Sequence, residues 1–152
     1  MHRDSEKISL TIKNKRKETN YGRECTPVVL EVKDFEPREV MMVDYKFDQA
    51  TDREGQIAGI PRGGKVTVRV KAMNDGNNQL IAWMLDPTMP KDFSVKFVNT
   101  VDGAAMKEIK GTNCYCINYV EKWEDGEQHY EEIEIVCQKL ENGPVGYDNP
   151  WK

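Results

Sequence analysis

Apolar residues in the first half of the chain recur at every second position, the spacing of a β-strand that buries one face. Three segments show this spacing: residues 28–32, 41–47 and 65–72. The clearest is "KVTVRVKA" at residues 65–72, in which Val or Ala alternates with Lys, Thr or Arg. We therefore expect three strands. Their buried faces are expected to comprise Val28, Leu30 and Val32; Met41, Val43, Tyr45 and Phe47; and Val66, Val68, Val70 and Ala72.

The spacing changes to that of a helix in "NDGNNQLIAWMLDP", residues 74–87. Asn74 or Asn77 can cap the first turn by accepting backbone N–H groups. Pro87 is expected to end the helix, because the residue before a proline avoids the α-helical region. The packing face of this short helix is expected to comprise Leu80, Trp83 and Met84.

The second half of the chain returns to strand patterns, at residues 93–97, 106–123 and 129–140. The tail "ENGPVGYDNPWK" is expected to be irregular. The long strand carries apolar or aromatic residues on both faces, so each face needs a cover, which could be the helix or another subunit. We expect Cys114, Cys116 and Val120 on one face, and the subunit-interface candidates Tyr115, Ile117 and Tyr119 on the other. The fold class predicted is mainly β, with antiparallel strands that form a barrel or a sandwich and one short helix.

A long connection, "DQATDREGQIAGIPRGG" at residues 48–64, separates the second and third strands. Connections of this length are usually functional or disordered, and both interpretations stay open on pattern alone. Its glycines permit backbone angles that other residues avoid. The residues of this loop that are singled out for a functional role are Asp48, Gln49, Asp52, Arg53, Glu54, Gly55, Arg62, Gly63 and Gly64.

Composition narrows the function classes. The chain has 152 residues, of which 32% are charged and 38% hydrophobic, with a net charge of -4. The acidic balance argues against nucleic acid as a partner, and no apolar run is long enough for a membrane-spanning helix. The N-terminus has basic residues but no apolar segment, so we expect no secretory signal peptide and a protein that is made in the cytoplasm.

No catalytic or cofactor site stands out. The four cysteines, Cys25, Cys114, Cys116 and Cys137, are expected to be free, structural thiols, because the Cys-x-Cys spacing departs from that of zinc sites. "GIPRGG" precedes a strand rather than a helix and so lacks the geometry of a phosphate-binding loop. The carboxylates of Glu131, Glu132 and Glu134 are interpreted as an exposed strand face. We expect no metal, no cofactor and no enzymatic activity; a small enzyme or a monomeric ligand-binding barrel is the alternative.

The order of motifs resembles the Hcp (TssD) family, the tube proteins of bacterial type VI secretion systems, over residues 26–152. The residues that carry the resemblance are Tyr45, Phe47 and Gln49; Asp52 and Gly55; Arg62, Gly63 and Gly64; and Trp83, Met84, Asp86 and Pro87. The charged "AMKEIK" and the closing "NPWK" fit as well.

The resemblance implies a compact antiparallel β-barrel with one short helix on its side and a long protruding loop. It further implies six-membered rings that stack into a hollow tube, with the loop residues named above as candidate contacts with the neighbouring ring. It also implies partners: the sheath, spike and baseplate proteins of the system, and effector proteins carried in the lumen. The tube would be assembled inside the sheath in the cytoplasm and released on firing.

Residues 1–25 depart from the family pattern as an N-terminal extension. Within them, residues 5–13 alternate like a strand, with Ile8, Leu10 and Ile12 on one face. We expect this segment to pair on the outside of the barrel. The extension keeps a second interpretation open, in which the protein is a specialised relative that acts as an effector-carrying adaptor or a tube terminator.

Overall fold

The structure is a computed structural model that describes residues 27–99 and 101–151. Within these residues the elements are β1 (Val28–Val32), β2 (Arg38–Tyr45), β3 (Lys65–Lys71), α2 (Gln79–Met84), β4 (Lys91–Val98), β5 (Ala105–Lys122), β6 (Tyr130–Asn142) and β7 (Val145–Asp148). The three strands and the helix expected in the first half of the chain are present. The strand expected at residues 5–13 lies outside the described residues.

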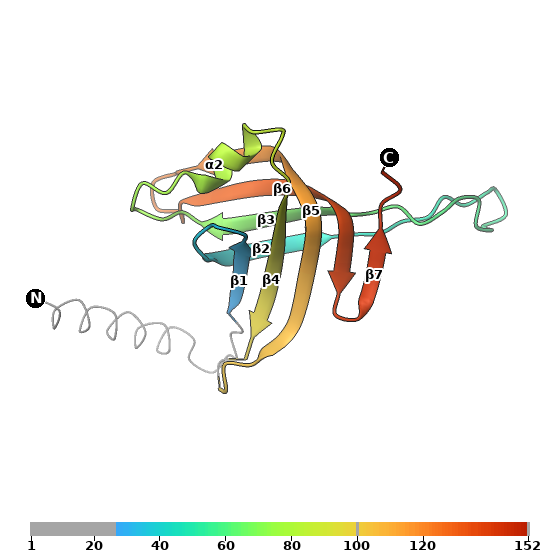
Figure 1. Ribbon diagram of the computed structural model, residues 1–152, viewed down its shortest axis with the longest axis horizontal. Coiled ribbons are helices and arrows are strands. Elements are labelled where there is room, and N and C mark those ends of the chain that lie inside the picture. The colour runs from blue at the N-terminus through green and yellow to red at the C-terminus, as the bar shows by residue number, and fades with distance from the viewer. Residues whose placement is uncertain (1–26, 100, 152) are drawn as a thin grey trace, which may run out of the picture.

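Six of the strands close into an antiparallel barrel, which confirms the predicted fold class (Figure 1). The order is β3-β2-β1-β4-β5-β6, and β6 pairs back with β3. One edge of β6 changes partner along its length: residues 130–136 pair with β3, and residues 139–142 pair with β7. The strand β7 therefore continues the sheet beyond Lys65, the first residue of β3. The long connection joins the barrel at the same point.

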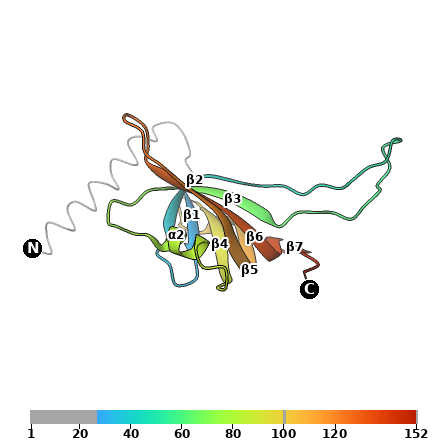
Figure 2. The ribbon, with the colours of Figure 1, turned by 90° about the horizontal axis from the view of Figure 1, so that it is seen from above.

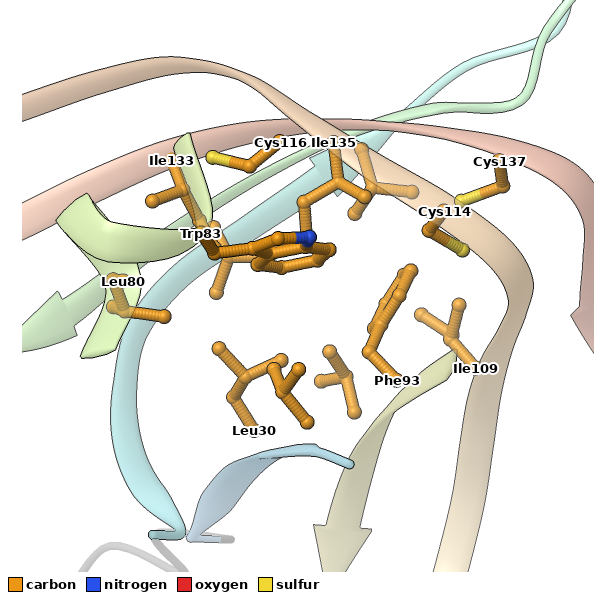
Figure 3. Packing of buried hydrophobic residues seen from close by; sticks show 14 of the residues in the cluster. Leu30, Leu80, Trp83, Phe93, Ile109, Cys114, Cys116, Ile133, Ile135 and Cys137 are labelled. Atoms are coloured by element: carbon orange, nitrogen blue, oxygen red, sulfur yellow. The ribbon is translucent and has the colours of Figure 1, made fainter. Parts of the chain in front are cut away.

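The interior is filled by the alternating faces that the sequence pattern predicts. The buried cluster comprises Leu30, Val32, Val66, Val68, Val70, Leu80, Trp83, Phe93, Val95, Ile109, Cys114, Cys116, Ile133, Ile135, Cys137 and Leu140. The helix α2 sends Leu80 and Trp83 into this cluster, where the indole of Trp83 lies among side chains from several strands (Figure 3). Phe35 meets Trp83 edge-on, with 6.2 Å between ring centroids.

A β-bulge in β5 places some of its residues on the opposite face from the one predicted. The register shifts between Cys116 and Asn118, so that Tyr119 lies opposite the buried Ile133. A bulge adds one residue to one strand and reverses the alternation beyond it. Tyr119 therefore packs against the core, and Val120 is exposed. The prediction that Tyr115, Ile117 and Tyr119 share an outer face is wrong for Tyr119.

A second bulge, between Val40 and Met42, acts on β2 in the same way. Val43 and Tyr45 pack against the core as predicted. Met41 is exposed, contrary to the prediction, and Phe47 lies beyond the end of the strand.

The C-terminal tail is more regular than predicted, because residues 145–148 form β7. Asn142 pairs with Val145 across a two-residue turn whose first residue, Gly143, has φ 58°. Glycine at this turn position suits the twist of a hairpin. The Gly-Pro dipeptide at residues 143 and 144 therefore forms a hairpin turn.

The carboxylates of β6 divide between the two faces. Glu132 and Glu134 lie outside and pair with Arg69 and Lys65 of β3, at 2.9 Å and 3.2 Å. Glu131 points inward and is buried, which corrects the prediction that all three are exposed.

Candidate assembly surfaces

The connection between β2 and β3 is a narrow two-stranded arm that projects far from the barrel (Figures 1 and 2). We call residues 46–64 the ribbon. Asp48 and Arg62 pair as antiparallel neighbours, with N–O distances of 3.0 Å and 2.7 Å, and Thr51 pairs with Ile57 further out. The candidate contact residues of the predicted loop thus lie along an arm with cross-strand hydrogen bonds.

A side-chain turn closes the tip of the ribbon. Asp52 Oδ1 accepts hydrogen bonds from the backbone N–H groups of Glu54 and Gln56, both at 2.9 Å. Gly55 has φ 82°, a region that residues with a Cβ rarely adopt. Asp52 and Gly55, two of the motif residues, therefore shape the turn, and the side chains of Arg53 and Glu54 are left exposed.

The ribbon is exposed except at its root, where Gly63 is half-buried and Gly64 is buried. Every residue from 46 to 62 is exposed, and the apolar side chains of Ile57 and Ile60 are 70% and 65% exposed. A two-stranded hairpin on its own is marginally stable in water. The arm therefore presents apolar and charged groups well away from the barrel core.

Aromatic rings pack around the root of the ribbon. The ring of Phe47 lies against Gly63, so closely that a Cβ at residue 63 would overlap it. Phe47 also meets Tyr45 and Tyr147 at centroid distances of 6.0 Å and 5.0 Å. Only glycine at residue 63 leaves room for the ring of Phe47. The neighbouring Gly64 has φ 89°, a backbone conformation that residues with a Cβ rarely adopt.

The C-terminal tail ties this root to the barrel. Asn149 Nδ2 donates to the carbonyl oxygens of Cys137 and Gly63, at 2.8 Å and 3.3 Å. Tyr147 Oη donates to the carbonyl of Pro61 at 3.3 Å. Sequence reasoning gave no role to Tyr147 or Asn149, because bonds to backbone carbonyls leave no periodic signal. The "NPWK" motif was the only hint.

An apolar groove of about 520 Å³ runs beside this root. It is lined by Tyr45, Phe47, Pro61, Leu140, Asn142, Val145, Gly146 and Tyr147. The groove therefore joins the start of the ribbon to the β6–β7 hairpin.

Two of the three interface candidates on β5, Tyr115 and Ile117, lie on its outer face. Tyr115 lies beside Trp151 of the tail, with 6.2 Å between ring centroids, and Ile117 is exposed. Leu80 and Trp83 of the predicted packing helix are buried, and Met84 packs against the core at its margin.

The part of the chain that the structure describes contains no cluster of three or more His, Cys, Asp or Glu side chains that could hold a metal ion. Cys114, Cys116 and Cys137 are free and buried. Burial raises the pKa of the Cys116 thiol to about 11. Among the described residues there is also no helix long and apolar enough to cross a membrane.

Comparisons with known proteins agree with this geometry. The family model described as "Hemolysin coregulated protein Hcp (TssD)" matches residues 26–152. No curated protein matches the chain. The fold is similar to that of Hcp1 from Flavobacterium johnsoniae, with a TM-score of 0.75 and 30% identity, over 81% of this chain and 99% of that chain.

Two more distant structures share the fold alone. Hcp1 from the E. coli EAEC 042 pathovar has a TM-score of 0.65 at 15% identity, over 84% of this chain and 100% of that chain. A chain of the sheath–tube complex of PVC, an extracellular contractile injection system, has a TM-score of 0.55 at 15% identity, over 85% of this chain and 93% of that chain.

The family match covers the barrel, the ribbon and the tail, and the first 25 residues lie outside it. The chain belongs to the Hcp (TssD) family, the non-enzymatic tube proteins of type VI secretion systems.

Proposed function

We propose that this chain closes into homohexameric rings and that the rings stack into a hollow tube. The observation that carries the proposal is the ribbon, whose cross-strand hydrogen bonds define its shape while every residue from 46 to 62 is exposed. A projecting arm with exposed isoleucines is suited to contact with another molecule. Membership of a family of tube proteins supports a further copy of the same chain as the partner.

Two different interfaces are needed for a stacked tube. A head-to-tail contact that closes forms the ring, and a second contact along the axis joins the rings. We assign the outer face of β5, with Tyr115 and Ile117, to the contact within the ring. The ribbon, with Arg53, Glu54, Ile57 and Ile60 near its end, is assigned to the contact between rings, where apolar burial and charge pairing both contribute.

The remaining steps follow from the family's place in contractile systems. The tube assembles in the cytoplasm inside a sheath, on a baseplate and behind a spike, and it leaves the cell when the sheath contracts. Its lumen carries effector proteins. Support for the sheath comes from the similar chain in the sheath–tube complex of the extracellular injection system.

Native mass spectrometry and negative-stain electron microscopy of the full chain test the proposal together. We expect a species of six times the chain mass of 17.5 kDa, and ring-shaped particles that form stacks at high concentration. A monomer at high concentration and moderate salt would contradict it and would favour a ligand-binding barrel.

A specialised subunit is the second candidate, because residues 1–25 lie outside the family match. An adaptor or tube terminator would form rings, but the extension would limit stacking or hold a cargo. Comparing the tubes formed by the full chain with those formed by residues 26–152 separates a terminator from an ordinary tube subunit. Longer tubes from the shorter chain favour a terminator. Tubes of equal length favour an ordinary tube subunit.

A further inference from the structure

Two thiols face each other across neighbouring strands inside the barrel. Cys114 of β5 lies directly opposite Cys137 of β6 in the strand register. Both side chains point into the core and neither is exposed to solvent. The close-up shows the two sulfur-bearing side chains next to each other, apart from the third thiol (Figure 3).

Backbone hydrogen bonds define the type of this cross-strand pair. The N–H of Cys137 donates to the carbonyl of Gly64 at 2.7 Å, and its C=O accepts from Asn149 Nδ2 at 2.8 Å. Both backbone groups of Cys137 therefore point away from β5. Cys114 and Cys137 thus form a non-hydrogen-bonded pair, in which the Cα atoms are about 4.5 Å apart and the side chains are closest.

That spacing suits a covalent link. A disulfide needs Cα atoms roughly 4.4–6.8 Å apart and side chains that point toward each other. We propose that Cys114 and Cys137 are a site for an intramolecular disulfide that joins β5 to β6 when the protein meets an oxidant. The proposal does not depend on the proposed function, since it concerns the barrel of a single chain.

The reaction with glutathione disulfide balances without any further reactant. The thiolate of one cysteine attacks a glutathione sulfur, which forms a mixed disulfide and releases one glutathione thiolate. The second cysteine then attacks the protein sulfur of that mixed disulfide and releases the second glutathione. The two protein thiols lose two electrons and two protons, and glutathione disulfide is reduced to two glutathione molecules.

The closed barrel makes this reaction slow. The hydrogen bond with the Cys137 thiol, followed by burial, raises the pKa of Cys114 well above that of an ordinary thiol. The thiolate is the reactive form. Oxidation therefore needs alkaline conditions or a transient opening of the sheet, and the protein stays reduced in a reducing cytoplasm.

The cross-link has a defined structural consequence. It joins the strands at the point where β6 changes its other neighbour from β3 to β7, beside Gly64 and Asn149 at the root of the ribbon. A disulfide restricts the unfolded chain more than the folded one. The oxidised protein is therefore expected to unfold at a higher denaturant concentration than the reduced protein.

Cys116 serves as a matched internal control. It is buried on the same strand, but the residue opposite it is Ile135. Cys114 and Cys116 are neighbours on one face of the same strand, so their Cβ atoms are about 6.8 Å apart. A disulfide needs Cβ atoms within about 4.5 Å of each other, so this pair cannot form one.

The experiment uses the full chain with Cys25→Ser, which removes the one cysteine outside the described residues. In this background we compare three proteins: one with no further substitution, one with Cys116→Val and one with Cys137→Val. Each protein is incubated with glutathione disulfide at about pH 8.5, where an ordinary thiol is half ionised, and in guanidinium below its unfolding midpoint. The remaining thiols are then alkylated under full denaturation, and the masses and linked peptides are determined.

We expect the first two proteins to lose two alkylatable thiols, to yield a Cys114–Cys137 linked peptide, and to show a higher unfolding midpoint that a reductant reverses. The Cys137→Val protein is expected to lose none to an internal disulfide. A Cys116→Val protein that keeps both thiols after prolonged incubation would overturn the proposal, and so would a linked peptide containing Cys116 or a lower midpoint after oxidation. The Cys116→Val protein decides the outcome even if Cys137→Val does not fold.

Discussion

Arg38 and Glu131 form an ion pair inside the barrel, with 3.3 Å between Arg38 Nη1 and Glu131 Oε2. Arg38 Nη2 also donates to the carbonyl of Lys71 at 2.8 Å. The two side chains are only 3% and 5% exposed, and Arg38 Nε is buried without a hydrogen-bond partner among the described residues. Each charge is therefore tolerated because the other is present.

Removing one charge of this pair is expected to destabilise the fold strongly. The Glu131→Gln substitution leaves Arg38 buried without its counter-ion, at a cost of about 3–5 kcal/mol in the free energy of unfolding. The double substitution Arg38→Met with Glu131→Leu is expected to recover most of that loss, since apolar side chains of similar volume can replace a buried pair.

Chemical denaturation measures both effects. The matched control is Glu132→Gln, on the outer face of the same strand, where the pair with Arg69 is partly exposed and worth about 1 kcal/mol or less. If Glu131→Gln and Glu132→Gln lower the free energy of unfolding equally, the pair of Arg38 and Glu131 is not desolvated.

Alkaline pH is expected to destabilise the protein in part through Tyr119. Burial, and then the charge of Glu131, raises the pKa of Tyr119 to about 12, from an ordinary value of 10.0. The folded state therefore favours the neutral phenol. Its contribution to the free energy of unfolding is complete below pH 10 and is lost as the pH rises toward 12.

Guanidinium unfolding midpoints between pH 9 and pH 12 measure this loss. The Tyr119→Phe variant is expected to lose less stability than the unchanged protein above pH 10, because it has no phenol to ionise. Tyr115→Phe, on the outer face of β5, is the control and is expected to follow the unchanged protein. Identical profiles for all three proteins would contradict the assignment.

The two glycines with positive φ in the ribbon are expected to differ in their tolerance of alanine. At Gly64, φ is 89° and a Cβ would lie 3.1 Å from the carbonyl oxygen of Cys137 and closer still to Asn149. Gly64→Ala is therefore expected to cost about 1–3 kcal/mol. At Gly55, φ is 82° but nothing lies within 4 Å, so Gly55→Ala strains only the tip.

Thermal unfolding distinguishes the two variants. A clear drop in Tm for Gly64→Ala with a smaller drop for Gly55→Ala is the expected result. A tolerant Gly64 would mean that Asn149 does not anchor the root of the ribbon.

Polar residues at the exposed isoleucines of the ribbon are expected to weaken stacking without affecting the barrel. The Ile57→Ser and Ile60→Ser substitutions change no buried contact of the single chain. The free energy of unfolding is therefore expected to change by no more than about 0.5 kcal/mol. Sedimentation velocity is expected to show single rings in place of stacks. The control is Val101→Ser, at a side chain that is 90% exposed in the β4–β5 turn. Unchanged stacks in the ribbon variant would remove the ribbon from the contact between rings.

Local pattern was sufficient for most of the barrel. The alternation of Val66, Val68 and Val70 and the helical spacing of Leu80 and Trp83 predicted both their elements and their burial. This works because a strand turns every second side chain to one face and a helix every third or fourth, whatever lies around them. The order of short motifs further predicted the family.

Long-range contacts decided the rest. The bulge that turns Tyr119 inward depends on how β6 lies beside β5, and the partner of Glu131 is 93 residues away in the chain. The ribbon root brings together Phe47, Gly63 and Asn149 from three separate segments. Such contacts carry no signal in the neighbouring sequence, because the groups that satisfy a buried charge or a backbone carbonyl are brought into place only when the barrel closes.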